Sequence, residues 1–564
     1  MEYDLVIKNG AVVDGSGLPM THADVGIKSG VVADVGRIRG RAHRTIDADG
    51  LVVAPGFIDP HTHYDAQLCW DPLALTSTWH GVTTVVTGNC GYTLAPVRPQ
   101  DRDYMTKTFA KVEGMSLETL ERGISWEWES FAEYLGVLER RLGVNVVPYV
   151  GHTAIRRYVL GGEASERRAT GGEIERMEVE VRRAMDAGAA GFSTALSPSA
   201  VGWYEEPIPS RLASDDEVER LCGVVGELHA GSLMILPRSS VFGIDDHDRA
   251  FLIRVAQETG CNVVIQTRLV QEAIDAAAPV FGLLQVRQFD RVFSLKSTSK
   301  GTSILDGMLS WGEVMRQNLD ERLRLLRDDA FRQAMRRDAL HPNTDPAKGV
   351  VLPGLPWDTT YVHRTALERN KRHEGKSIAQ LAAEQHKEIA DALLDLALDE
   401  GLDTLFRTCR ARDHDAEQAL RRDLRSPYAL VGISDAGAHL DRDDGADYTT
   451  YFLQEYVRNQ QVFTLEEAVR MLTLAPASVF GLRDRGLLRP GYAADIVVFD
   501  PQRIGLASKG LSGEIPGGDE RYAAVPEGVE YTIVNGEVLM RGLHHEGAYP
   551  GRVLRVTEKG GARR

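Results

Sequence analysis

The sequence predicts an α/β protein, a (β/α)8 barrel of the TIM type with a small β-sandwich domain formed by both termini. Three observations support this fold. Short apolar runs alternate with helical segments through the middle of the chain, which is typical of buried parallel strands joined by helices. Both ends instead carry β-branched runs separated by turn dipeptides. The length of 564 residues accommodates a large barrel together with a smaller domain.

The two ends of the chain share one pattern. DLVIKNG, AVVDGSG and ADVGIKSG in the first fifty residues end at Asn-Gly, Asp-Gly or Ser-Gly, the pattern of β-hairpins. ADIVVFDP (494–501) and VEYTIVNGEVLMRG (529–542) repeat it near the C-terminus. We therefore expect residues 1–52 and 486–558 to form one composite β-sandwich.

We expect residues 53–485 to form the barrel. We expect helices at EIERMEVEVRRAMDAG, SDDEVERLCGVVGELHAG and DDHDRAFLIRVAQETG, and the last two begin with Ser or Asp and end in Gly, as capped helices do. Residues near 297–345 interrupt the alternation with Arg-, Asp- and Leu-rich sequence. We interpret them as a helical insertion, either a solvated pair of amphipathic helices or a lid over the site.

Composition excludes several classes of function. The net charge of −16 disfavours a nucleic-acid partner, because phosphate binding needs clustered Lys and Arg. The start MEYDLVIKNG has no basic stretch followed by an apolar one, so we do not expect a signal peptide. No apolar run reaches about 18 residues, so no membrane span is expected. Five scattered cysteines do not indicate a disulfide framework and fit a reducing cytoplasm. We expect a cytoplasmic protein with a small-molecule substrate, and leave open whether it forms a homo-oligomer.

The strongest chemical signal is GFIDPHTHYD at residues 56–65. His61 and His63 alternate at the end of an apolar strand, so both imidazoles point to one face. At the carboxyl end of a barrel strand that face is the catalytic mouth. Two neutral imidazoles converging there form half of a zinc site, whereas the alternative is a pair of solvent-exposed loop histidines.

Two further residues follow apolar strands. Asp435 in VGISDAGAHL would face the metal across the barrel, as a ligand and as the general base for a metal-bound water; the alternative is a helix N-cap. Cys90 in TTVVTGNCG would be a soft thiolate ligand. Its alternative is a buried structural cysteine.

Together these stretches resemble the amidohydrolase superfamily and, more narrowly, the D-aminoacylase or N-acyl-D-amino-acid deacylase family. IKNGAVVDGSG, APGFIDPHTHYD, GVTTVVTGNCG, YVGHTAIR, SDAGAH and LLRPGYAADIVVFDP spread the likeness over nearly the whole chain. The resemblance implies zinc-dependent hydrolysis of an N-acyl bond. It also implies that His61, His63, Asp435 and Cys90 are metal ligands. His152, in YVGHTAIR, would polarise the scissile carbonyl or remain a core histidine.

The sequence departs from that family at two positions. The resemblance implies two more histidine ligands after the fifth and sixth strands, but LMILPRSS (233–240) and NVVIQTRL (262–269) contain none. We therefore favour one Zn²⁺ and consider the second subsite doubtful. The corresponding residues are Pro237 or Arg238 and Gln266 or Arg268, while His229 and His247 are interpreted as surface residues.

A substrate carboxylate would be bound by a cation near the mouth. Arg268 and Lys296 are the candidates that we favour, with Arg238 as a further one, and Tyr204, beside Trp203, could line the pocket. His439 is interpreted as a support for the site or a cap, or else as a substrate contact. The predicted function is metal-dependent hydrolysis of an N-acyl-D-amino acid or a similar small amide, with Asp435 as base. The alternatives are a C–N hydrolase acting on a cyclic amide or urea, and a metal-depleted, non-catalytic barrel.

Overall fold

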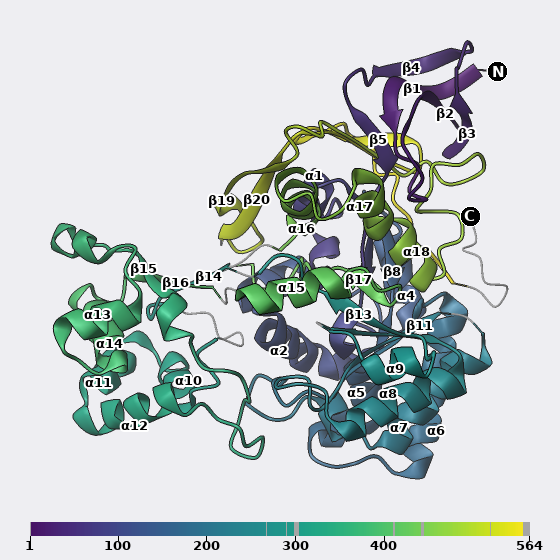
Figure 1. Cartoon of the computed structure of the whole chain (residues 1–564). Helices are drawn as coiled ribbons and strands as arrows, with labels where there is room; N and C mark the ends of the chain where they lie inside the picture. Colours follow the sequence, from purple (N-terminus) through teal and green to yellow (C-terminus); the bar gives the residue numbers. More distant parts are fainter. Residues whose placement is uncertain are drawn as a thin grey trace.

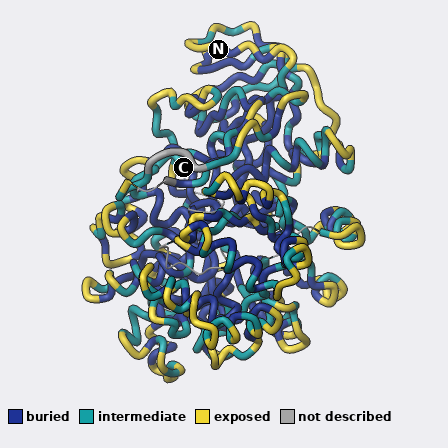
Figure 2. The backbone as a smooth tube through the Cα atoms, turned by 90° about the vertical axis from the view of Figure 1, so that its left-hand side faces the viewer, coloured by how far each residue is buried: buried dark blue, intermediate teal, exposed yellow. Residues whose placement is uncertain are grey.

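The computed structural model describes residues 2–229, 231–266, 268–288, 290–297, 304–409, 412–440, 445–518 and 520–556. Three parts are distinct in Figure 1: a β-sheet that contains the N-terminal strands, a central α/β part, and a mainly helical part at the left of the view. Buried backbone is concentrated in the central part and inside the terminal sheet (Figure 2). The described residues contain no helix long and apolar enough to cross a membrane.

The terminal sheet joins both ends of the chain. Its nine strands run in the order β23-β22-β21-β18-β5-β1-β2-β3, with β4 paired to β1. Leu5, Ile7, Val25 and Ile533 pack in its core, so the β-branched runs at the two ends bury a common face. This establishes a shared sheet for the two ends; the expected sandwich is not established. The strands are β1 (Glu2–Val12), β2 (Thr21–Lys28), β3 (Val31–Gly36), β4 (Arg41–Asp47), β5 (Val52–Pro55), β18 (Ile496–Phe499), β21 (Val529–Val534), β22 (Glu537–Arg541) and β23 (His544–His545).

The central part contains two parallel sheets that follow one another along the chain. The first has the order β6-β7-β8 and the second β9-β10-β11-β12-β13-β17. Only Tyr149 separates β8 from β9. Among the described residues β17 and β6 are not paired; the bridge between Thr62 and Ala436 lies just beyond their ends. An α/β fold is therefore established, and a closed barrel is not. The strands are β6 (Phe57–Asp59), β7 (Val82–Thr87), β8 (Asn145–Pro148), β9 (Val150–Gly151), β10 (Gly191–Ala195), β11 (Ser232–Leu236), β12 (Asn262–Gln266), β13 (Val280–Leu284) and β17 (Ala429–Val431).

Helices connect and flank these strands. The predicted N-caps of α7 and α8 hold, and α8 ends at Gly260 as predicted, but α7 ends at Leu228 and not at a glycine. Ser214 accepts a hydrogen bond from the Glu217 amide at the start of α7, and Asp245 accepts one from the Asp248 amide at the start of α8. The helices of this part are α1 (Leu75–Trp79), α2 (Arg102–Glu113), α3 (Leu117–Gly123), α4 (Phe131–Leu138), α5 (His152–Leu160), α6 (Gly171–Ala187), α7 (Asp215–Glu227), α8 (Asp246–Thr259), α9 (Gln271–Asp275), α15 (His414–Asp423), α16 (Tyr448–Phe452), α17 (Leu465–Leu472) and α18 (Leu474–Val479). A hairpin of β19 (Gly505–Glu514) and β20 (Glu520–Glu527) precedes β21.

The helical part extends from residue 290 to 409, well beyond the 297–345 that the sequence predicted. It has its own hydrophobic core, which includes Trp311, Leu393 and Phe406. Strands distant in sequence close it, because β16 pairs with both β14 and β15. Residues 298–303 of the predicted insertion lie outside the described residues. The elements are β14 (Asp290–Phe293), α10 (Leu309–Met315), α11 (Leu319–Arg327), α12 (Asp329–Leu340), β15 (Thr360–Arg364), α13 (Ile378–Gln385), α14 (Ile389–Asp399) and β16 (Leu405–Cys409).

Candidate metal centre

His61 and His63 lie directly after β6 and are almost completely buried, at 0% and 3% exposure. Their ring centroids are 5.1 Å apart. The backbone between them is held on both sides: the Thr62 amide donates to the Val86 carbonyl of β7, and the His63 amide donates to Ala436. Both imidazoles therefore point into the same space, and neither is a solvent-exposed loop residue.

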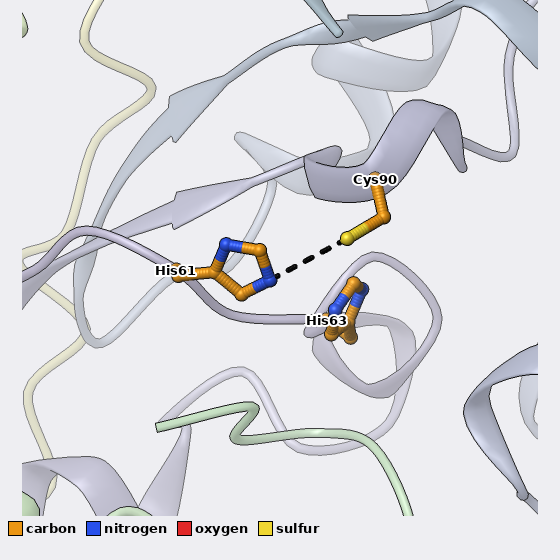
Figure 3. Close-up of side chains that lie close together, drawn as sticks. All are labelled: His61, His63 and Cys90. Carbon is orange, nitrogen blue, oxygen red and sulfur yellow. Dashed lines mark hydrogen bonds between the residues drawn. The ribbon is translucent and has the colours of Figure 1, made fainter. Parts of the chain in front are cut away.

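Cys90 enters this space from the turn after β7. Its sulfur lies 3.6 Å from Nε2 of His61, the contact drawn in Figure 3. One donor atom from each of His61, His63 and Cys90 lies within 4.8 Å of the other two. Nitrogen and thiolate sulfur are the donors that zinc prefers.

Asp435 follows β17 and faces the two histidines. Its Oδ1 lies 3.4 Å from Nε2 of His61 and 3.5 Å from Nε2 of His63. The Asp435 side chain is 21% exposed, so it reaches the cluster and the adjoining cavity. The residues after it form a turn and no helix, which removes the alternative of a helix N-cap.

Glu113, which the sequence analysis missed, is the last residue of α2. Its Oε1 lies 3.3 Å from Nδ1 of His63, and its side chain is 4% exposed. The only local signal was an acidic residue just before the glycine that ends a helix, an electrostatically unfavourable place for a carboxylate. Its approach to His63 depends on packing between distant segments.

The donor set fits a divalent cation. Within the described part of the chain, buried atoms without a hydrogen-bond partner include Nδ1 of His61 and His63, Oε1 of Glu113 and Oδ1 of Asp435. Such orphan atoms are rare in folded proteins and call for an explanation, an ion among others. When ionised, the thiol and the two carboxylates that face the two imidazoles carry negative charge, which a bound cation would balance.

The ionisation of the metal-free side chains reflects their crowding. Burial disfavours the imidazolium of His61, but the Cys90 thiolate and the Asp435 carboxylate outweigh this and raise its pKa to about 9. Burial likewise opposes ionisation of Cys90, yet His61 and His63 lower the pKa of the thiol to about 7. Despite its burial, the two imidazoles hold the pKa of Asp435 well below its usual range. Burial raises the pKa of Glu113 to about 8.

Gln266 is the last residue of β12, in the segment 262–269 that contains no histidine. Its amide Nε2 lies 2.9 Å from Nε2 of His61 and donates to the Cys90 sulfur at 3.4 Å. Gln266 therefore reaches the cluster, but a neutral amide is a much poorer ligand for zinc than an imidazole.

A cavity of about 370 Å³ opens from the cluster. Gln266 and Asp435 line this cavity, and the helical part contributes the apolar side chains of Ile304, Leu352 and Leu355. Among the described residues that line it, Arg291 of β14 carries the positive charge. Arg291 is paired with Thr408 of β16, which also lines the cavity.

The structure does not support the predicted role of His152. This side chain is fully buried, with Nδ1 at 2.8 Å from the Thr194 hydroxyl and Nε2 at 2.9 Å from the Glu217 carboxylate. Both ring nitrogens are thus engaged in the core between α5 and α7. Neither is available to polarise a substrate carbonyl, and the alternative of a core histidine describes it better.

The three predicted substrate-binding residues are not among the residues that line the cavity. Arg268 places Nη1 near the position a Cβ would take on Gly243. Lys296 forms an exposed ion pair with Asp403 at 2.7 Å. Tyr204 is 71% exposed and receives a long hydrogen bond from Lys107. None of them is among the residues that line the cavity, because charge and nearness to a strand end do not determine where a loop side chain points.

The remaining candidates also have definite places. Arg238 pairs with Asp215, as does His247, whose side chain is 60% exposed. His229 is exposed, as expected. His439 is half-buried, and its amide donates to the carbonyl of Glu113 at 2.6 Å. Through this hydrogen bond the His439 backbone helps to hold Glu113 in place beside the cluster.

The parallel-strand fold and the donor cluster are those of an amidohydrolase, a hydrolase of carbon–nitrogen bonds. Comparison with known proteins agrees: the profile of the amidohydrolase family matches residues 44–540. The chain belongs to this family.

The relatives also confirm the resemblance to the deacylase branch. A D-aminoacylase from Alcaligenes xylosoxydans xylosoxydans is 28% identical, with 98% of each chain covered. An N-acyl-D-glutamate deacylase from the same organism is 28% identical, covering 98% of this chain and 97% of the relative. Among solved structures, a crystal structure of D-aminoacylase superimposes with a TM-score of 0.63 at 25% identity, covering 98% of this chain and all of that one.

Proposed function

We propose that this protein is a zinc-dependent deacylase that hydrolyses the amide bond of an N-acyl-D-amino acid or a similar small N-acyl compound. The observation that carries the proposal is the meeting of His61, His63, Cys90 and Asp435 in one buried cluster, whose Asp435 also lines a cavity. Relatives with D-aminoacylase and N-acyl-D-glutamate deacylase activity support the substrate class. We further propose that β6 to β13 together with β17 form the wall of a (β/α)8 barrel, because their order along the two parallel sheets follows the sequence.

One zinc ion would be held by His61, His63 and Asp435, with Cys90 close enough to join them. Thiolate among the donors favours zinc over harder ions such as Mg²⁺. Zinc bound there would lower the pKa of a bound water to about 7 and polarise the acyl carbonyl. The segments 233–240 and 262–269, where the resemblance implies two further histidine ligands, contain no histidine, which favours a single ion.

Asp435 is placed to move the proton. Its pKa is well below the usual range, so the carboxylate is ionised and can accept a proton from the attacking water. The same proton then passes to the amide nitrogen as the carbon–nitrogen bond breaks. The products are a carboxylic acid and an amine, and Asp435 returns to its ionised form. Proton transfer by a positioned side chain contributes about 10²–10⁴-fold to rate.

Arg291 is the residue that we propose for the substrate carboxylate. It replaces Arg268, Lys296 and Tyr204 in this role, because it lines the same cavity as Asp435. A guanidinium pairs with a carboxylate through two parallel hydrogen bonds. The apolar wall formed by Ile304, Leu352 and Leu355 would then contact the acyl group or the amino-acid side chain.

The test is a substrate panel with purified protein. N-acetyl-D- and N-acetyl-L-amino acids and hydantoin rings are compared before chelation, after chelation and after addition of zinc. We expect hydrolysis of N-acetyl-D-amino acids that is lost on chelation and restored by zinc. Zinc-dependent hydrolysis of the rings alone would instead support the cyclic-amide alternative. Equal turnover by the chelated protein would contradict the proposal.

A further inference from the structure

Glu113 occupies an unusual position beside the proposed metal site. It is the last residue of α2, its carboxylate is buried, and its Oε1 lies 3.3 Å from Nδ1 of His63. Neither of these two atoms has a hydrogen-bond partner elsewhere in the described residues. Because each faces the other, a small rotation of either side chain would join them in a hydrogen bond.

A buried carboxylate at the C-terminal end of α2 does not by itself stabilise the fold. The C-terminal end of a helix carries partial negative charge, which repels an anion. Gly114 follows in the left-handed region at φ 62° and ends the helix, so the carboxylate lies against that end. Burial adds a desolvation cost. Because both effects disfavour a buried carboxylate at this position, we expect it to have a favourable interaction with a neighbouring group that offsets them.

The backbone of Glu113 ties the helix to the other half of the site. Its carbonyl accepts a hydrogen bond of 2.6 Å from the His439 amide. His439 ends the turn that begins at Asp435, and both residues have positive φ. The side chain of Glu113 therefore contacts the segment that carries His61 and His63. Its main chain is hydrogen-bonded to the segment that carries Asp435.

We propose that Glu113 is a positioning residue of the metal centre, whose carboxylate accepts the Nδ1–H of His63 and thereby directs Nε2 toward the ion. The inference rests on the proposed function, because it assumes that a metal occupies the site. Histidine ligands of metals commonly donate their other N–H to a carboxylate, and loss of that partner costs about 10–100-fold in metal affinity.

The test is a double-mutant cycle on zinc affinity, measured by competition with a chromophoric chelator. Glu113→Ala should weaken zinc binding about 10–100-fold. In a His63→Ala background the same change should alter the affinity by less than about twofold, since the residue acts through His63. Glu118→Ala, which removes an exposed carboxylate on the neighbouring α3, is the matched control and should bind zinc like the native protein.

The outcomes separate the competing roles. An equal loss of affinity in both backgrounds would mean that Glu113 acts without His63 and would overturn the proposal. Native zinc affinity together with a lower melting temperature would show a purely structural role and overturn it as well. Should Glu113→Ala not fold, Glu113→Met keeps a side chain of similar length without an oxygen acceptor and carries the same cycle. Native protein that binds no zinc would contradict the proposed function itself, whereas native binding with an indifferent Glu113 contradicts only this inference.

Discussion

Replacing Arg291 by Met tests how the cavity recognises its substrate. The change keeps an unbranched chain of similar length and removes the positive charge from the cavity lining. A hydrogen bond to a charged group is worth about 1.5–3 kcal/mol. At about 1.4 kcal/mol per factor of ten, the loss corresponds to about 10- to 100-fold in kcat/KM for a substrate with a free carboxylate.

The assay compares an N-acetyl-D-amino acid with its primary carboxamide, which has the same shape without the charge. Native enzyme should prefer the acid by about 10- to 100-fold, and Arg291→Met should lose that preference while hydrolysing the carboxamide as before. Arg268→Met is the matched control, because Arg268 is not part of the cavity lining. If Arg291→Met still discriminates as the native enzyme does, the assignment of the substrate carboxylate to Arg291 is refuted.

Three further predictions concern the metal centre. Asp435→Asn should lower kcat by about 10²–10⁴-fold while metal analysis still finds zinc on the remaining donors; unchanged turnover would remove the proposed base. Zinc affinity should strengthen as the pH rises from 7 toward 9, because the ion must displace protons from His61 and His63. The metal-free pKa of His61 is about 9, and that of His63 is raised well above its usual value. A dissociation constant that does not change with pH would contradict this. Gly437→Ala should lower the free energy of unfolding by about 1–3 kcal/mol and weaken zinc binding, since a Cβ there would approach the His63 carbonyl to 2.6 Å at φ +93°. Gly375→Ala, which has a similar φ and open space around it, should keep native zinc affinity, and equal losses in both variants would refute a local effect on the site.

The proposed metal donors were predictable because they obey a local rule. His61, His63, Cys90 and Asp435 each follow a strand whose apolar run is plain in the sequence, and the carboxyl ends of parallel strands gather at one edge. The same rule also selected His152, which follows β9. There the residue begins α5 and turns into the core toward Glu217, a choice that depends on the packing of two helices.

The missed residues depend on contacts between distant segments. Arg291 reaches the cavity because β14 pairs with β16 across more than a hundred residues, and the sequence analysis predicted only a shorter helical insertion there. Glu113 reaches His63 through the end of a helix that was not predicted. Lys296, selected for its charge, instead pairs with Asp403 at the surface.

The most direct test of the account is anomalous diffraction at the zinc absorption edge from crystals of the zinc-loaded protein. We predict one strong peak, with His61 and His63 nitrogens and an Asp435 oxygen at about 2.0–2.2 Å. A peak at the exposed group of Asp245, His247 and Asp248, or two peaks in the cavity, would contradict the single-ion site. No peak between the two imidazoles would contradict the hydrolase mechanism as a whole.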